Sequence, residues 1–281
     1  MKKFILFLFF IVGLLILIVT NTSWLSFGQN NEKIEVTDAI NKIEIHASSG
    51  NTQVIPENRD TVDVEYNGKG KVELKKTGDT IKIEYKSKNW FHFLSFNEKK
   101  LKIYIPEHYQ NQLIMNSNSG NIEFAGNSKI NFDRVSIEIG SGNLSLEQMT
   151  TNEFVSNSKS GNFKIDTLTT KSGSIDVKSG NVEVNNYSGQ LKSDITSGRL
   201  QLQLAELISD IDIKVHSGDA TVDLPENADY HLKGKIGSGV ITTNGLNMSN
   251  LKENEHSIEG TSGTGKHSIS LDVSSGRIGL N

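Results

Sequence analysis

Ser160-Gly161-Asn162-Phe163-Lys164-Ile165 and Ser179-Gly180-Asn181-Val182-Glu183-Val184 are two copies of the stretch that decides the fold of this chain. Each copy begins with a Ser-Gly pair and continues as an alternation of polar and apolar residues. Glycine supplies the backbone freedom that a tight corner requires. Alternation with a period of two is typical of a strand with one buried face. The stretch therefore predicts a corner followed by a half-buried strand.

The same stretch recurs along the chain at a nearly constant interval. Twelve Ser-Gly pairs are present, and the glycines at 120, 142, 161, 180, 198, 218 and 239 are separated by 22, 19, 19, 18, 20 and 21 residues. A repeat of one strand-and-corner unit at a fixed period indicates stacked coils. We therefore predict an all-β fold, a mainly parallel β-solenoid or β-helix with coils of about 20 residues.

The alternation also predicts which side chains line the core and which line the corners. Asparagine follows glycine at four corners, and stacked asparagines form hydrogen-bonded ladders in cross-β structures. We expect such a ladder here, formed by Asn121, Asn143, Asn162 and Asn181. We expect Ile278-Gly279-Leu280 to close the last coil. The residues expected to face the core are Ile122, Phe124, Leu144, Leu146, Phe163, Ile165, Ile175, Val177, Val182, Val184, Leu200, Leu202, Ile211, Ile213, Val222 and Leu224.

The segment before the regular repeats alternates in the same way. Residues 33–110 contain six short alternating runs, and Gly78-Asp79 is a turn dipeptide between two of them. The three prolines each follow an apolar residue and precede glutamate. Because proline cannot donate a hydrogen bond to a sheet, each is expected to end a strand or turn a corner. These are Pro56, Pro106 and Pro225.

The N-terminus predicts a membrane anchor. Lys2 and Lys3 precede sixteen uninterrupted apolar residues, 4–19, and no charge follows until Glu32. A helix of this length with its flanking residues spans about 33 Å, which is enough to cross a bilayer. The two lysines favour a cytoplasmic N-terminus. We expect one uncleaved transmembrane helix with the rest of the chain outside the cell, and a cleaved signal peptide is the alternative.

Three parts of the chain follow from these patterns. They are an anchor over residues 1–27, an N-terminal β unit over residues 28–110 and the Ser-Gly-repeat solenoid over residues 111–281. The chain has no cysteine, which excludes disulfides and thiolate metal sites.

The corners and strands together resemble a known bacterial family, the "putative adhesin" domain. The resemblance rests on the Ser-Gly-Asn/Asp corners, the Leu224-Pro225-Glu226 turn with Tyr230, and the closing run from Gly265 to Ile278. It covers residues 30–281, and its members include LiaG-type membrane-anchored proteins of cell-envelope stress operons. The resemblance implies a location at the cell membrane, an envelope-stress context and a binding or adhesive role. Its motifs are structural, so it implies no catalytic residue.

One segment differs in composition from the rest and is the candidate contact site. Residues 67–102 carry ten lysines and four acidic residues, a net charge of +6. Bulky apolar side chains lie between two groups of lysines here, and they either cap the core of the first β unit or insert at a lipid interface. Aromatic rings favour the membrane interface, and each lysine near an anionic surface contributes about 1 kcal/mol. The candidate residues are Lys86, Lys88, Trp90, Phe91, Phe93, Phe96, Lys99 and Lys100.

Several other motifs are interpreted as coincidental. Residues 260–268 nearly match a phosphate-binding loop, but His267 replaces its hydroxyl residue and a strand pattern follows where a helix is required. Ser156 with Lys159, and Ser249 with Lys252, match Ser-x-x-Lys, which requires a helix. The seven histidines lack metal-ligand spacing. Asp210, Asp212, Asp219 and Asp223 are interpreted as solvated charges, with carbohydrate chemistry on one face as the alternative.

Together with what the resemblance implies, these patterns predict a non-enzymatic, membrane-anchored extracytoplasmic protein of the bacterial cell envelope, with a binding or adhesive role. The alternative is a carbohydrate-active β-helix enzyme that acts on a wall or surface polysaccharide. No cofactor and no metal are expected. The expected partners are the membrane, anionic lipid or wall polymer, and membrane proteins of the envelope-stress response, without nucleic acid.

Overall fold

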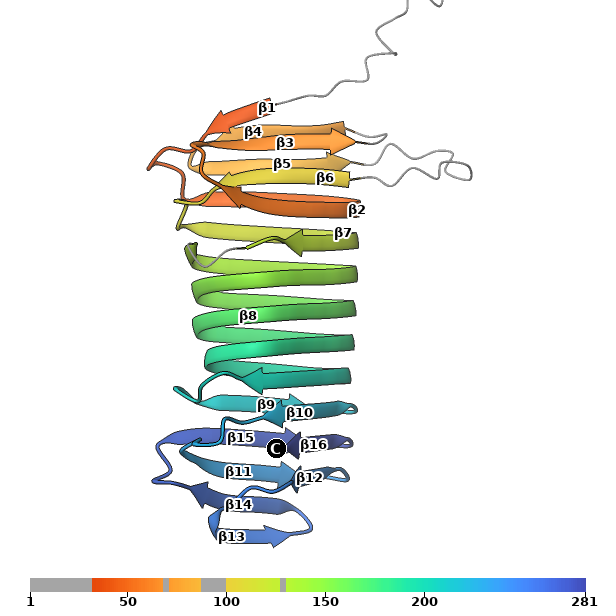
Figure 1. The fold of residues 1–281 in the computed structure, drawn as a ribbon. Helices are drawn as coiled ribbons and strands as arrows, with labels where there is room; N and C mark the ends of the chain where they lie inside the picture. The colour runs from red at the N-terminus through yellow and green to blue at the C-terminus, as the bar shows by residue number, and fades with distance from the viewer. Residues whose placement is uncertain (1–31, 68–70, 87–99, 127–129) are drawn as a thin grey trace, which may run out of the picture. The chain divides into compact units, whose positions relative to one another are not determined.

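The computed structural model describes residues 32–67, 71–86, 100–126 and 130–281, which form strands and connecting turns (Figure 1). Among these residues no helix is long and apolar enough to cross a membrane. The predicted anchor, residues 1–27, lies outside the described part of the chain. Residues Asn31–Asn281 form one compact unit. The prediction of an all-β fold is confirmed.

The described residues of this unit form sixteen strands, and β8 alone winds through several coils (Figure 1). They are β1 (Glu32–Glu35), β2 (Lys42–Glu57), β3 (Thr61–Asn67), β4 (Lys71–Thr77), β5 (Thr80–Lys86), β6 (Lys100–Pro106), β7 (Gln112–Phe124), β8 (Asn131–Leu204), β9 (Ile211–Val215), β10 (Asp219–Asp223), β11 (Tyr230–Ile236), β12 (Val240–Thr243), β13 (Ser249–Asn254), β14 (Ser257–Ser262), β15 (His267–Val273) and β16 (Arg277–Leu280).

Each coil has two long sides that meet at a Ser-Gly corner. The side that leads into the corner is called the entry face, and the side that leaves it is called the exit face. Strand β9 lies on the entry face and β10 on the exit face, where they pair in parallel with residues 191–195 and 199–203 of β8. The predicted parallel stacking is therefore present through the centre of the unit.

The corner glycines stack directly on one another. A Cβ atom on Gly180, whose φ is +126°, would lie 1.8 Å from the carbonyl oxygen of Gly161. Every larger residue would therefore push the coils apart at this point. In spatial order the stacked glycines are Gly50, Gly120, Gly142, Gly161, Gly180, Gly198, Gly218, Gly276 and Gly239.

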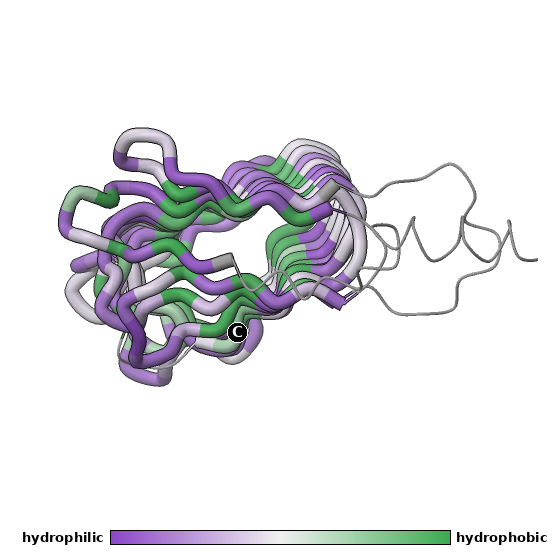
Figure 2. Tube along the Cα trace, turned by 90° about the horizontal axis from the view of Figure 1, so that it is seen from above, coloured by the Kyte–Doolittle hydropathy of each residue, from purple (hydrophilic) through white to green (hydrophobic). Residues whose placement is uncertain are grey.

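The hydrophobic core lies between the two faces. Hydrophobic and hydrophilic positions superimpose from coil to coil when the stack is viewed along its length (Figure 2). Fifteen of the sixteen residues predicted to face the core are buried. The exception is Leu224, which is only half-buried because β10 ends before it and Pro225 follows. Glu57 and Pro106 end β2 and β6, so the prediction that the prolines mark strand ends is confirmed.

Four serines occupy core positions that carry aliphatic residues in neighbouring coils. Ser156 and Ser158 lie 19 residues after the buried Ile137 and Ile139. Their hydroxyls, and that of Ser117, are buried without a hydrogen-bond partner among the described residues. The hydroxyl of Ser193 differs, because it donates to the carbonyl oxygen of Ile175 at 2.7 Å.

The order of coils in space differs from the order in sequence at the C-terminal end. Strands β15 and β16 insert between β9–β10 and β11–β12. The prediction that Ile278-Gly279-Leu280 close the last coil is therefore wrong, since β16 has a neighbour on both sides. The spacing of the Ser-Gly pairs is the same for both arrangements, so it could not reveal this insertion.

The N-terminal end has a related arrangement. Strand β2 pairs in parallel with β7 on one side and with β5 and β6 on the other. Antiparallel strands then complete this end, with β4 on β5, β3 on β6 and β1 on β3. The expected turn at Gly78 is present with φ +61°. Strands β1 and β3 to β6 thus connect to the stack through β2.

Candidate functional site

The predicted contact residues belong to the connection between β5 and β6. Lys88, Trp90, Phe91, Phe93, Phe96 and Lys99 fall within residues 87–99, outside the described part of the chain. Lys86 is the last residue of β5, and Lys100, which is exposed, is the first residue of β6. The two ends of the segment are therefore fixed by strand pairing.

Strand register shows that this segment replaces a Ser-Gly corner. Ala47 pairs with Tyr85, and Asn51 pairs with Lys100. Three residues turn the corner in β2, whereas fourteen residues, 86–99, connect the same two points in the adjacent coil. The connection that contains the basic and aromatic residues is thus eleven residues longer than the Ser-Gly corner of the adjacent coil.

An asparagine ladder begins beside Lys100 and runs along the same corner. Asn121 donates from Nδ2 to Asn51 Oδ1 at 2.8 Å, and Asn143 donates to Asn121 Oδ1 at 3.0 Å. Asn162 and Asn181 continue with bonds of 3.1 and 3.0 Å to the preceding side chain. The predicted ladder is confirmed. Its fifth member, Asn51, was missed because it lies 70 residues before Asn121 in sequence.

Charged residues continue the column after Asn181. Arg199 pairs in register with Asp219, and Asp219 pairs in register with Arg277. The guanidinium of Arg199 lies 3.9 Å from the Asp219 carboxylate, and both side chains are more than half exposed. The corner therefore presents amides along one part of its length and charged groups of both signs along the next.

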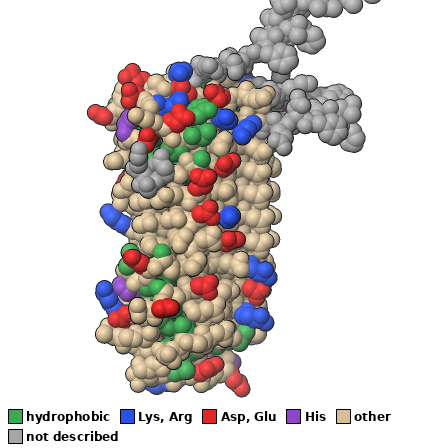
Figure 3. All heavy atoms as spheres, in the orientation of Figure 1, with side chains coloured by type: hydrophobic (Ala, Val, Ile, Leu, Met, Phe, Trp, Pro, Cys, Tyr) green, Lys and Arg blue, Asp and Glu red, His purple; other side chains and the backbone are tan. Residues whose placement is uncertain are grey.

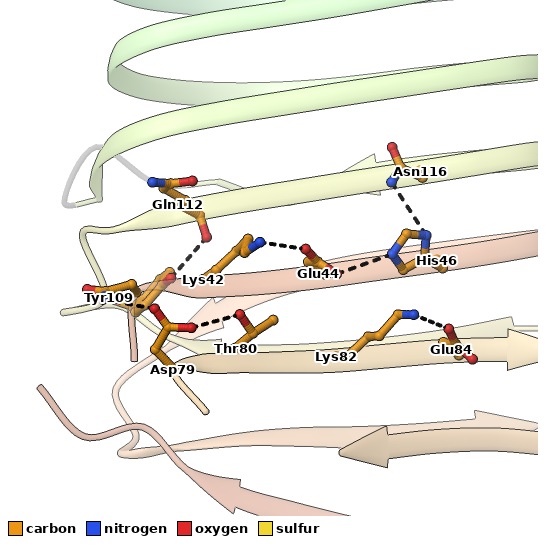
Figure 4. A network of polar contacts seen from close by, with 11 residues as sticks. Lys42, Glu44, His46, Asp79, Thr80, Lys82, Glu84, Tyr109, Gln112 and Asn116 are labelled. Atoms are coloured by element: carbon orange, nitrogen blue, oxygen red, sulfur yellow. Dashed lines mark hydrogen bonds and ion pairs between the residues drawn. The ribbon is translucent and has the colours of Figure 1, made fainter. Parts of the chain in front are cut away.

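The outer side of the entry face near the N-terminal end has a different character, since its charges are paired with one another (Figure 4). Lys42 Nζ lies 2.9 Å from Glu44 Oε1, and the same carboxylate faces His46 at 3.6 Å. The hydrogen bond from Lys42 lowers the pKa of Glu44. Lys82 and Glu84 form a second pair on the neighbouring strand. Most of this charge is therefore neutralised locally.

The segment that resembles a phosphate-binding loop is organised by a carboxylate of the protein itself. Asp229 Oδ1 accepts from the backbone N–H groups of Thr264 and Lys266 at 2.8 and 2.9 Å, and its Oδ2 accepts from the Thr264 hydroxyl. These bonds lower the pKa of Asp229, and the bond from the Lys266 backbone contributes most. Gly263 and Gly265 provide the positive φ angles of the turn. The N–H groups that a phosphate would require are therefore already occupied.

The four aspartates considered for carbohydrate chemistry are divided between different positions. Asp212 lies on β9 of the entry face, whereas Asp219 and Asp223 lie on β10 of the exit face. Asp210 Oδ1 accepts from the backbone of Ser268, and Asp223 Oδ1 accepts from Asn281. These four carboxylates do not converge on one site.

One carboxylate pair that the sequence reasoning did not single out lies on the entry face. Asp176 and Asp194 occupy outward positions 18 residues apart, and burial together with the charge of Asp194 raises the pKa of Asp176. His216 Nε2 lies 3.2 Å from Asp194 Oδ1. Only the spacing of 18 residues could have indicated this contact.

The remaining sequence motifs have structural positions. Ser156 faces the core, whereas Lys159 is exposed, so this Ser-x-x-Lys match does not bring its two side chains together. Ser249 and Lys252 lie on the exposed strand β13. Among the described residues no group of three or more histidine and acidic side chains is arranged to hold a metal ion.

Comparison with known proteins identifies similar folds. The family described as Toastrack DUF4097 matches residues 40–281. A putative adhesin from Parabacteroides distasonis ATCC 8503 is similar with a TM-score of 0.57 and 15% identity, over 90% of this chain and 96% of that one. A putative adhesin from Bacteroides fragilis NCTC 9343 is similar with a TM-score of 0.50 and 14% identity, over 91% and 98%. No curated protein matches the chain.

Proposed function

This chain belongs to the Toastrack DUF4097 family, and we propose that it is a non-enzymatic, membrane-anchored extracytoplasmic protein that binds an anionic surface of the bacterial cell envelope. A binding or adhesive role fits the family and the adhesin descriptions of the similar structures. The proposal includes the single-pass anchor over residues 1–27 and the envelope-stress context. Both come from the sequence pattern and the resemblance.

The observation that carries the proposal is the insertion between β5 and β6. A segment with lysines at both ends and four aromatic residues between them occupies a corner where the adjacent coil uses three residues. Its exit residue, Lys100, is exposed, and Lys102 follows on the same strand. Aromatic and basic residues together favour an anionic interface.

The ligand chemistry of this segment is the phosphate group. Phosphate can come from a lipid headgroup or from a wall polymer, and the aromatic residues distinguish the two sources. Insertion of rings requires a lipid interface, whereas binding of a dissolved polymer depends on the lysines alone.

The test is a binding experiment with a chain that lacks residues 1–30, since Asn31–Asn281 form a compact unit. Vesicles of phosphatidylglycerol, vesicles of phosphatidylcholine and purified wall polymer are compared across a salt series. The test variant carries Trp90→Ser, Phe91→Ser and Phe93→Ser. The matched control carries Ile208→Ser, Val240→Ser and Leu251→Ser, the large hydrophobic residues that are exposed in the described part of the chain.

The proposal predicts salt-sensitive binding to phosphatidylglycerol that the test variant loses and the control retains, with a blue shift of tryptophan fluorescence in the unsubstituted chain. Binding of the polymer that both variants retain, without binding to phosphatidylglycerol, would make polymer rather than lipid the anionic ligand of the protein. Absence of binding to either anionic ligand would overturn the proposal.

A further inference from the structure

The nine stacked corners form a continuous surface with its own composition. This surface, called the corner edge, consists of the four residues x-Ser-Gly-x at each stacked glycine. In spatial order the corners are residues 48–51, 118–121, 140–143, 159–162, 178–181, 196–199, 216–219, 274–277 and 237–240. Adjacent corners are separated by the spacing of hydrogen-bonded strands, about 4.8 Å.

The charge of the corner edge has the opposite sign to that of the chain. The edge carries Lys159, Lys178, Arg199 and Arg277 with Asp219 as its one acidic residue, whereas the chain has a net charge of −4. Figure 3 shows the edge from the side, on the right, as mostly uncharged polar atoms above and charged side chains below. The four basic groups stand at the fourth, fifth, sixth and eighth of the nine corners.

These basic side chains are available to a ligand. Lys178 and Arg277 have no ion pair among the described residues. Lys159 lies 3.9 Å from Glu138, and Arg199 lies 3.9 Å from Asp219, at the outer limit for ion pairs. All four of these paired side chains are more than half exposed, and exposed pairs contribute little.

The neutral groups of the corner edge are hydrogen-bond donors. Eight of the nine corner serines are exposed, and Ser49 is half-buried. An asparagine amide has two hydrogens. Asn121, Asn143, Asn162 and Asn181 each use one of them in the ladder, so a second remains at each step. Val240 is the one large apolar side chain on the edge.

We propose that the corner edge binds a linear polyanion, a polymer of phosphate units, extended along the stack of coils. The inference rests on the proposed binding role, deepens it, and assigns part of it to residues other than those of the segment between β5 and β6. The edge presents hydrogen-bond donors at constant spacing together with four basic groups. This arrangement is complementary to an extended chain of negative groups. Val240 is the one large apolar side chain on the edge, and this scarcity of apolar side chains argues for dissolved polymer rather than lipid as the occupant.

The experiment uses the full chain in neutral detergent, so that no lipid headgroup competes. The probe is long-chain inorganic polyphosphate, with tripolyphosphate as the short comparison. The test variant carries Lys159→Gln, Lys178→Gln, Arg199→Gln and Arg277→Gln. The matched control carries Lys192→Gln, Lys214→Gln, Lys233→Gln and Lys235→Gln, four exposed lysines on the strands of the entry face. Both variants lose the same number of positive charges.

The proposal predicts that long polyphosphate binds more tightly than tripolyphosphate and that the control retains this binding. For the test variant, the logarithm of the binding constant should fall less steeply with the logarithm of the salt concentration. We expect the magnitude of this slope to decrease by about 0.7 per replaced residue, about 3 in total. Asp219→Asn should tighten binding, because it removes the one negative charge of the edge.

Three outcomes would overturn the proposal. They are equal weakening of the two quadruple variants, equal affinity for short and long polyphosphate, and no binding of polyphosphate. The vesicle experiment contains no polyphosphate and this one contains no anionic lipid. Loss of vesicle binding by the Trp90, Phe91 and Phe93 variant with unchanged polyphosphate binding would therefore separate the two surfaces.

Discussion

Asn143 donates two hydrogen bonds to a single atom, the Oδ1 of Asn121, from its backbone N–H at 3.1 Å and from its Nδ2 at 3.0 Å. The side-chain oxygen of Asn121 thus holds both the backbone and the side chain of Asn143 in the next coil. Asn162 then donates to Asn143 Oδ1, so the Asn143 amide is held from both sides.

Replacement of a central asparagine should weaken the stack. Asn143→Ala removes two hydrogen bonds between side chains, and we expect a loss of about 1 kcal/mol in the free energy of unfolding because the site is exposed. Ser145→Ala is the control, since Ser145 is exposed on the same strand. Urea unfolding measures both, and equal midpoints for the two variants would contradict a stabilising ladder.

The corner glycines should tolerate no side chain. Gly180→Ala places a Cβ atom 1.8 Å from the Gly161 carbonyl oxygen at a φ of +126°. We expect a loss of about 3 kcal/mol or failure to fold. Gly279→Ala is the comparison, because its nearest neighbour would be 3.7 Å away, and its thermal midpoint should stay near that of the unsubstituted chain.

Two core serines should respond to the same substitution with opposite signs. Ser158→Ala removes a buried hydroxyl that has no partner, and we expect an increase of about 1 kcal/mol in the free energy of unfolding. Ser193→Ala removes a buried hydrogen bond to the carbonyl oxygen of Ile175, so we expect a decrease of similar size. Denaturant unfolding of both variants is the measurement, and a loss of stability in Ser158→Ala would refute the first expectation.

The turn held by Asp229 should be sensitive to acid. The folded state lowers the pKa of Asp229, so its stabilising effect is present above the unfolded pKa of about 3.9 and is lost as the pH falls through the lower folded value. Asp229→Ala should therefore lower the thermal midpoint at pH 7. The difference from the unsubstituted chain should shrink at acidic pH. Asp219→Ala, which removes an exposed carboxylate, should show little change at either pH.

The repeated corners could be predicted from sequence because each is a local event. Ser-Gly followed by alternation specifies a corner and the inward side of the next strand, without reference to distant residues. That is why the core positions from Ile122 to Val222 and the four central asparagines were predicted correctly. Asn51 lies next to Asn121 because β2 pairs directly with β7, while the intervening strands β3 to β6 lie on the other side of β2.

The candidate sites were less accessible to sequence reasoning. The basic and aromatic segment was visible as a change in composition, but only the register of β2 against β5 and β6 identifies it as an insertion at a corner. The corner edge was not visible, because its basic residues are 19, 21 and 78 residues apart and each appears isolated in sequence. The role of Asp229 was also missed, since its partners follow 35 and 37 residues later.

The insertion of β15 and β16 has a consequence for the biosynthesis of the chain. Strands β11, β13 and β14 connect to the stack through β15, and β12 connects through β16. The ribosome therefore synthesises residues 230–262 before β15 and β16, the strands through which they pair with the rest of the sheet. Until those strands are made, residues 230–262 lack these partners. A nascent chain that stops before His267 would retain open strand edges at β9 and β10. Proteases and chaperones could thus distinguish a prematurely ended chain from one whose translation has passed Leu280.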